Sequence, residues 1–370
     1  MAYSTGTAAT IPDLLDAIVT FLNANGWTQD SYAVDGTGKR YHANRGGKYI
    51  HFRSRVNENF NNSALSYDWV FNQASSGLVM YMGSGYSGAT NWWQQAGRPV
   101  GQAGSHQNPI VGIPVYQPYG SVNYHFFAHN SGDNIILTIE FIPNHFCHIA
   151  FGVSVDKRGQ TYTGGEYFMA NYTGYGWSPQ GQWENNTGSQ HVGANGLGVF
   201  SANGRNANSY MRIEVDGDTT GNFGNAWRSL CSSETSNGLS ASGVAGTPLS
   251  TAARFCWIDL DEYIIPQRYQ ANSPLNNIIL LTPLKVYVNR TTAAGQYTNA
   301  HSFAGEIPKI FAVNIRNLNV GQQISIGGVN YRVFPMNGSK QVGNFFFTSP
   351  SGAVTATSWG SGEYGYAIAE

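Results

Sequence analysis

Residues 145–148 (HFCH) bring together three side chains able to bind a transition metal. On a strand, His145 and Cys147 would share one face and His148 would point to the other. A structural zinc site needs four ligands, usually in spaced pairs, and the sequence has no second cysteine pair. Cys147, Cys231 and Cys256 are odd in number and widely spaced, which favours buried apolar roles over a disulfide framework. Ordinary packing therefore competes with metal binding, and we expect neither a metal nor another cofactor.

A second candidate for chemistry is the acidic group in WIDLDEY, which contains Asp259, Asp261 and Glu262. Asp259 and Asp261 would lie on one face of a strand. Two carboxylates about 5–10 Å apart across a cleft can hydrolyse a glycosidic bond, and carboxylate oxygens also bind Ca²⁺. The alternative is a solvated or salt-bridged strand end, so cation binding by these residues stays open.

Aromatic side chains among small polar residues form the third candidate. Such rings stack on sugars, anchor protein interfaces or fill a β-rich core. We carry all three interpretations forward for one set of residues. The set consists of Trp92, Trp93, Tyr172, Tyr175, Trp177 and Trp183.

Motifs of the common catalytic classes are missing from the sequence. It contains no nucleophile elbow, P-loop, HExxH motif or dinucleotide-binding fingerprint. The Gly-rich pieces at 83–85 and 164–165 lack the lysine or the strand–helix context that phosphate binding requires, so they are interpreted as turns. We therefore assign no catalytic residue and predict that the chain is not an enzyme.

The composition is typical of a β-rich protein with a polar but weakly charged surface. Charged residues make up 11% of the 370 residues, against a usual share of about 25%. The formal net charge of −1 gives no electrostatic reason to expect nucleic acid as a partner. No apolar run reaches the roughly 18 residues that a membrane-spanning helix needs, so we expect no membrane insertion.

One segment, residues 10–25, has the periodicity of an amphipathic helix. Thr10 is placed to cap it, Pro12 lies in the first turn, and Gly26 follows its end. Its apolar stripe should dock on a sheet or on a partner protein, and it is a candidate interface helix. The stripe consists of Leu14, Leu15, Ile18, Phe21 and Leu22.

Most of the remaining chain alternates between apolar and polar residues, as strands do. The strongest hairpin signal is Gly327-Gly328 between residues 323–326 and 329–334. The predicted fold class is mainly β, with antiparallel sandwich-like sheets, an N-terminal amphipathic helix and long Gly/Asn/Ser-rich loops. Other predicted strands are 49–55, 67–71, 78–82, 135–142, 148–155, 255–260 and 278–288.

Composition divides the chain into three parts. Residues 1–158 are predicted to hold the helix and a β-rich domain. Residues 159–250 are rich in Gly, Asn, Ser and Thr, and are predicted to be a loop-rich insertion or arm. Residues 251–370 are predicted to be a second β-rich part that packs with the first.

Two stretches resemble virion structural proteins of tailed bacteriophages. They are residues 11–27 (IPDLLDAIVTFLNANGW), and residues 308–340 (PKIFAVNIRNLNVGQQISIGGVNYRVFPMNGSK) together with Tyr364–Ile368. The resemblance implies a tail or baseplate protein that forms a homo-oligomer with other virion proteins as partners. It also implies localisation in the virion after assembly in the host cytoplasm.

Three functions remain as hypotheses. The first is a structural virion component that acts by protein–protein assembly. The second is a receptor-binding tail protein that contacts host-surface glycan through the clustered aromatic residues. The third is a particle-associated glycan hydrolase, which would need Asp259, Asp261 and Glu262 in a cleft.

Overall fold

The computed structural model describes residues 1–58, 75–92, 95–97, 111–115, 121–170, 210–215, 227–230, 256–258, 279–291, 297–336, 343–348, 354–359 and 364–370. In this part of the chain the secondary structure includes the helix α1, the short 3₁₀ turn Asn130–Gly132 and the strands β1–β20, all paired antiparallel. The predicted fold class, mainly β with an N-terminal helix, is therefore confirmed. No helix in these residues has the length and apolarity needed to cross a membrane.

Helix α1 (Ile11–Ala24) begins and ends where its local signals predict. The Thr10 side chain accepts a hydrogen bond from the Asp13 backbone N–H at 3.2 Å, which satisfies one of the free donors of the first turn. Asn25 is the C-cap of the helix, and Gly26 follows with a φ of +82°. This left-handed conformation costs glycine little, so the chain can turn away directly into Trp27.

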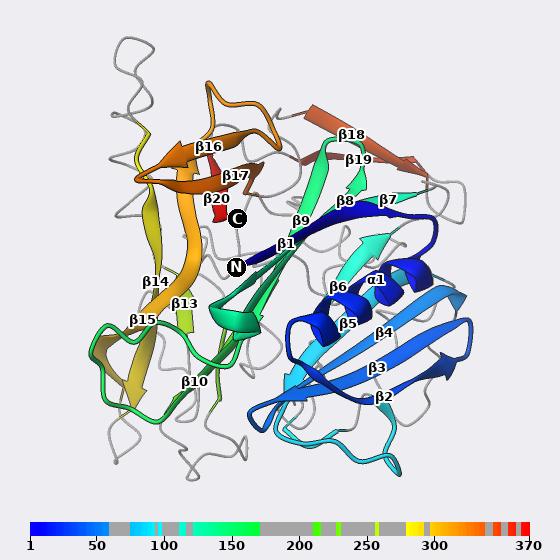
Figure 1. The fold of residues 1–370 in the computed structure, drawn as a ribbon, viewed down its shortest axis with the longest axis horizontal. Coiled ribbons are helices and arrows are strands. Elements are labelled where there is room, and N and C mark those ends of the chain that lie inside the picture. The colour runs from blue at the N-terminus through cyan, green and yellow to red at the C-terminus, as the bar shows by residue number, and fades with distance from the viewer. Residues whose placement is uncertain are drawn as a thin grey trace.

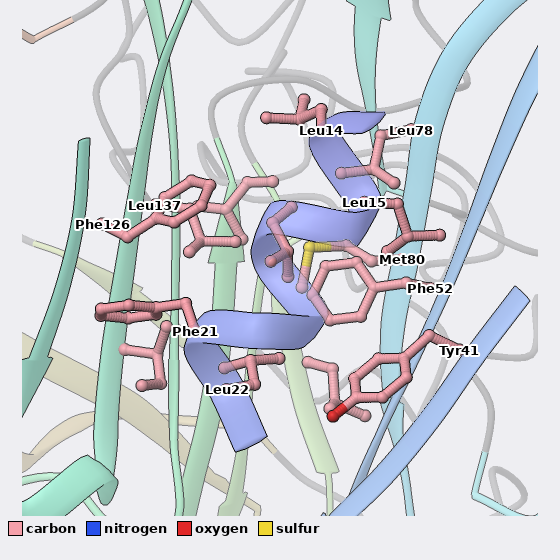
Figure 2. Close-up of a cluster of buried hydrophobic side chains, with 14 of the residues drawn as sticks. Leu14, Leu15, Phe21, Leu22, Tyr41, Phe52, Leu78, Met80, Phe126 and Leu137 are labelled. Carbon is pink, nitrogen blue, oxygen red and sulfur yellow. The ribbon is translucent and has the colours of Figure 1, made fainter. Parts of the chain in front are cut away.

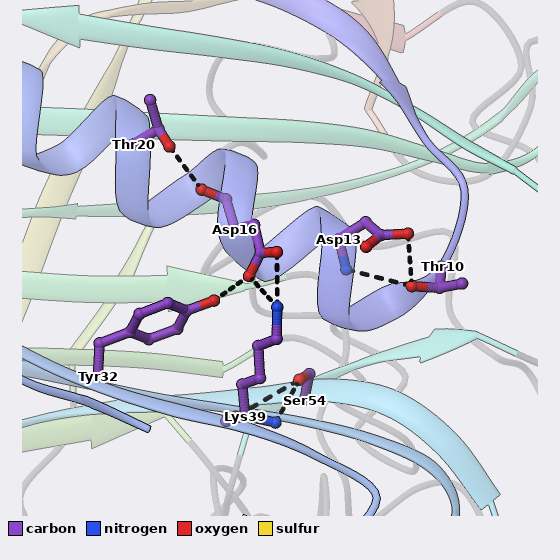
Figure 3. Close-up of polar contacts among 7 residues, drawn as sticks. All are labelled: Thr10, Asp13, Asp16, Thr20, Tyr32, Lys39 and Ser54. Carbon is purple, nitrogen blue, oxygen red and sulfur yellow. Dashed lines mark hydrogen bonds and ion pairs between the residues drawn. The ribbon is translucent and has the colours of Figure 1, made fainter. Parts of the chain in front are cut away.

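The helix lies on a five-stranded meander that we call the helix-side sheet. Its order is β2 (Thr28–Asp35), β3 (Gly38–Arg45), β4 (Lys48–Glu58), β5 (Ser75–Gly83) and β6 (Val111–Val115). Figure 1 shows α1 running along one face of this sheet. Asp16 fastens the helix to the sheet because its carboxylate binds the Lys39 ammonium at 2.6 Å and accepts a hydrogen bond from the Tyr32 hydroxyl (Figure 3).

A seven-stranded sheet, the central sheet, forms the middle layer. Its order is β1 (Ala2–Ala8), β7 (Val122–His129), β8 (Asn134–Ile142), β9 (His145–Gly152), β10 (Gly164–Ala170), β11 (Tyr210–Val215) and β12 (Trp227–Leu230). Successive residues of β8 alternate between two apolar cores: Ile135 and Leu137 face the helix side, and Ile136 faces the opposite side. Both faces of this sheet are covered, so its strands carry apolar residues in both directions.

The third layer is a six-stranded C-terminal sheet. Its order is β13 (Cys256–Ile258), β14 (Thr282–Thr291), β15 (Tyr297–Asn314), β20 (Tyr364–Ala369), β17 (Val329–Pro335) and β16 (Gln323–Ile326). The predicted Gly327–Gly328 hairpin turn joins β16 to β17, with φ values of +59° and +78°. A separate two-stranded sheet pairs β18 (Gly343–Thr348) with β19 (Val354–Trp359).

The apolar stripe of α1 packs against the chain's own sheets. Figure 2 shows Leu15 directed at Leu78 and Met80 of the helix-side sheet, while Phe21 points to Phe126 of the central sheet. The stripe therefore docks on sheets of its own chain, one of the two alternatives expected from the sequence, and its side chains are covered by two sheets. The residues concerned, none more than 7% exposed, are Leu14, Leu15, Ile18, Phe21 and Leu22.

A second core joins the central sheet to the C-terminal sheet. Phe127 and Ile136 pack in one cluster with Phe334, Tyr366 and Ile368. Tyr3 also packs against this cluster, so residues near the two ends of the chain share one hydrophobic core. Three strands inside the predicted 159–250 loop region, β10, β11 and β12, continue the central sheet; the composition of that region did not lead us to assign them.

Candidate functional site

The HFCH segment forms strand β9, and its two described ligand-type side chains point in opposite directions. Cys147 is buried in the helix-side core, where burial raises the pKa of its thiol. His148 faces the C-terminal sheet, and its ring nitrogens bond to the Thr138 hydroxyl at 2.9 Å and the Pro335 carbonyl at 2.8 Å. Both residues are held by packing. Among the described residues, no group of three or more His, Cys, Asp or Glu is placed to hold a metal.

The other sequence candidates lie mostly outside the described residues. Asp259, Asp261 and Glu262 do so, and so do five of the six aromatic residues: Trp93, Tyr172, Tyr175, Trp177 and Trp183. Trp92 is described and is 1% exposed, so an interface or glycan contact for it is wrong. The loop after β5 folds back on the outer face of the helix-side sheet. There the ring of Trp92 lies 6.2 Å from that of Tyr81 and 6.0 Å from the Arg53 guanidinium.

A layer of buried histidines lies on this outer face. His42 and His51 are paired across β3 and β4, with their Nδ1 atoms 2.7 Å apart. Burial, and secondarily the charge of Arg40, lowers the pKa of His42 to about 4. Burial lowers the pKa of His51 well below its usual value. Two neutral imidazoles that bond to each other are a structural pair, and at neutral pH they are weak bases.

A pocket of about 430 Å³ opens where the central and C-terminal sheets meet, and we call it the interlayer pocket. Three segments build it: the turn between β7 and β8, the connection after β9, and a stretch of β15 with Pro283 of β14. Its walls are mixed in polarity. The polar and charged lining residues are Asn130, Asp133, Asn134, Ser154, Asp156, Lys157, Arg158, Glu306 and Lys309, and the apolar ones are Val155, Pro283, Ile307, Pro308 and Phe311.

The backbone around the interlayer pocket is strained. Three of its lining residues, Asn130, Arg158 and Lys309, have φ values of +51°, +49° and +64°. Residues other than Gly, Asn and Asp rarely adopt this conformation, so the strain falls on Arg158 and Lys309, and such strain often collects at binding sites. The strained segments are held together by two backbone hydrogen bonds between Asp156 and Glu306, at 2.8 and 2.9 Å. Gly305 allows this approach, because a Cβ there would lie 2.6 Å from the Asp156 carbonyl oxygen.

The carboxylates of the interlayer pocket all have cationic partners. Glu306 accepts hydrogen bonds from two nitrogens of Arg158, at 2.6 and 2.8 Å. Asp156 lies 3.3 Å from the same guanidinium. Asp133 is bound at 2.7 Å by Arg45, which reaches it from β3. Each acidic side chain therefore has a cationic neighbour, although Asp156 and Glu306 share the single charge of Arg158.

One cation of the interlayer pocket, Lys309, has no partner among the described residues. Lys309 is exposed and makes no hydrogen bond or ion pair with the residues that the structure describes. Near it lies His129, which is fully buried and has no partner for either ring nitrogen in the described chain. Burial, followed by the charges of Lys309 and the N-terminal amine, lowers the pKa of His129 to about 3. Unsatisfied buried polar groups are rare in native proteins, so they mark this corner as unusual.

No family model and no curated protein matches this chain. The pocket therefore has to be interpreted from its own chemistry. A small volume, paired acids, amide groups and one free ammonium favour binding a small polar ligand. Neutral histidines and a protonated buried thiol provide no activated nucleophile or strong base at these described positions.

Only some of the residues that line the interlayer pocket lie in patterns that can be recognised from the sequence. The run 156–159 (DKRG) is a turn signal, and Pro308 and Lys309 begin the second phage-like stretch. Nothing local indicates that these two runs meet, because they are about 150 residues apart and are brought together only when two sheets pack. The turn at Asn130 carried no signal that we used.

Proposed function

We propose that this chain is a structural component of a tailed-phage virion, of the tail or baseplate type, which acts by protein–protein assembly as a homo-oligomer. The observation that carries the proposal is the resemblance at both ends of the chain. The phage-like stretches account for α1 at the N-terminal end and, toward the C-terminal end, for β16, β17, β20 and part of β15. They are therefore framework elements of the fold.

The arrangement of these stretches supports a shared architecture. The strands β15, β20, β17 and β16 are direct neighbours in the C-terminal sheet. The N-terminal strand approaches them as well, since the Arg332 guanidinium lies 5.0 Å from the ring centre of Tyr3. A resemblance confined to separate loops would support the proposal weakly. This resemblance includes adjacent strands of a single core, which supports it more strongly.

Exposed strand edges offer a route to assembly. Within the described residues, β2 and β16 each pair with one strand only, and Val34 on β2 is 77% exposed. An unpaired edge presents backbone donors and acceptors that a strand of another chain can continue. The low charge of the chain also reduces repulsion between copies.

The test is to locate the chain in a particle. Purified phage particles from the source of this sequence would be analysed by mass spectrometry and reconstructed by electron microscopy. We expect several copies in tail or baseplate density, in contact with other virion proteins. Absence from the particle would overturn the proposal, and density confined to the head would refute the tail assignment.

A further inference from the structure

The interlayer pocket combines one unpaired cation, several hydrogen-bonding groups and a small apolar wall. We propose that it binds a sugar residue that carries a single carboxylate. This proposal does not depend on the virion assignment, because it rests only on residues that line the pocket. It also concerns residues other than the aromatic set considered from the sequence.

The charge of the pocket selects a ligand with one negative charge. Its lining holds three carboxylates and three cations, and Arg45 adds one further cation from behind Asp133. The excess is a single positive charge, and the ammonium left without a partner is that of Lys309. A ligand carboxylate can pair with it through a charge-assisted hydrogen bond. Ligands with several phosphates would meet the walls of Asp133, Asp156 and Glu306 and be repelled.

The polar walls suit hydroxyl groups. Asn130 provides an amide that both donates and accepts, and carboxylates accept from hydroxyl donors. The partners already bound to Asp133 and Glu306 fix their orientation, since Arg45 and Arg158 hold one oxygen of each. Preoriented acceptors lose little entropy when a ligand binds. Vicinal hydroxyls of a sugar ring present closely spaced donors that such acceptors can share.

The apolar wall suits the carbon face of a sugar ring. Pro283, Pro308 and Phe311 are among the lining residues, so part of the pocket surface carries no hydrogen-bonding side chain. A pyranose is amphipathic in the same way, with C–H groups on its faces and hydroxyls around its edge. Pockets for small ligands usually span roughly 300–1,000 Å³, and 430 Å³ places this one in the range for one or two sugar rings.

The experiment uses the full chain and defined probes. Binding of sodium D-glucuronate would be measured by saturation-transfer NMR and by titration, with D-glucose and sodium acetate as the neutral-sugar and simple-anion controls. We expect glucuronate to bind at least about tenfold more tightly than either control, because each control lacks one of the two recognised features. Absence of glucuronate binding would overturn the proposal, and equal binding of acetate would reduce the pocket to a general anion site and refute it.

Variants of Lys309 assign the binding to this pocket. Lys309→Asn removes the charge with a residue that tolerates a positive φ, so the fold should persist and glucuronate affinity should fall about tenfold or more. Lys309→Arg keeps the charge and should bind like the parent. Arg40→Gln removes a cation on β3 outside the pocket lining and is the matched control. An unchanged affinity in Lys309→Asn, or an equal loss in Arg40→Gln, would show that the sugar binds elsewhere.

Discussion

The helix-side core and the interlayer pocket both use the central sheet. They differ in how many of their residues have a favourable backbone conformation and a partner for their polar groups. In the core, α1 has its cap, its periodic stripe and its terminal glycine, and its apolar side chains are buried. At the pocket, three lining residues have positive φ, and within the described residues the nearby His129 lacks hydrogen-bond partners and Lys309 is unpaired. Consistency at every level favours a single stable fold, and departures from it tend to gather where a protein binds something. The helix-side core is therefore the stabilising region, and the interlayer pocket is the region that retains backbone strain.

The largest expected effect comes from the core. Leu15→Ala should lower the free energy of unfolding by about 2–5 kcal/mol, because it leaves a cavity among Leu78, Met80 and the helix. Urea denaturation of the purified chain would measure it. Val34→Ala, at a side chain that is 77% exposed, is the control and should change stability by less than about 0.5 kcal/mol. Similar losses for the two variants would contradict the packing described for α1.

Acid should weaken the layers that contain buried histidines. The folded pKa values of His42, His148 and His129, about 4, 4 and 3, lie below the usual value of about 6.5. Their contribution to stability is therefore complete above pH 6.5 and is lost as the pH falls toward the folded values. When the pH falls from 7 to 5.5, each of these histidines should lower the free energy of unfolding by about 1 kcal/mol. Unfolding free energies that are equal at the two pH values would show that these side chains are solvated.

The cap of α1 allows a smaller test of the ordered region. Thr10→Ala should lower the free energy of unfolding by about 1 kcal/mol, since the Asp13 N–H loses its acceptor. Thr10→Asn preserves a capping oxygen and should restore most of the stability. The comparison is made by thermal unfolding of the three proteins. A Thr10→Asn protein as unstable as Thr10→Ala would mean that the side-chain cap contributes little.

The smallest expected effect is a gain in stability, and it concerns the interlayer pocket. Lys309→Gly and Lys309→Ala remove the same side-chain charge, but only glycine relieves the positive φ of +64°. We expect the glycine variant to be more stable than the alanine variant by up to about 1 kcal/mol, measured by urea denaturation. In an ordinary strand the order would be reversed. Greater stability of the alanine variant would show that the backbone at Lys309 is unstrained, and would remove part of the contrast between the two regions.

Sequence reasoning was correct where the signal is local. The capping residue, the apolar stripe and Gly26 lie within one helix, and Gly327–Gly328 lie between two adjacent strands. Interactions of this kind depend on residues a few positions apart, so the pattern alone predicts them. The mainly β fold class follows from the alternation of apolar and polar residues, which is also a short-range pattern. Strands β10, β11 and β12 escaped prediction because their surroundings are rich in turn-forming residues.

The sequence by itself determined α1, the predicted hairpin and the class of fold, since short-range geometry and side-chain periodicity are encoded in neighbouring residues. It could not decide that the stripe of α1 would be covered by its own chain, or that the loop carrying Trp92 would fold back and bury that ring on the sheet. Only the tertiary structure placed Asn130, Arg158 and Lys309 around one pocket. Their proximity arises from the packing of two sheets whose strands are far apart in the chain, and no local pattern records that packing.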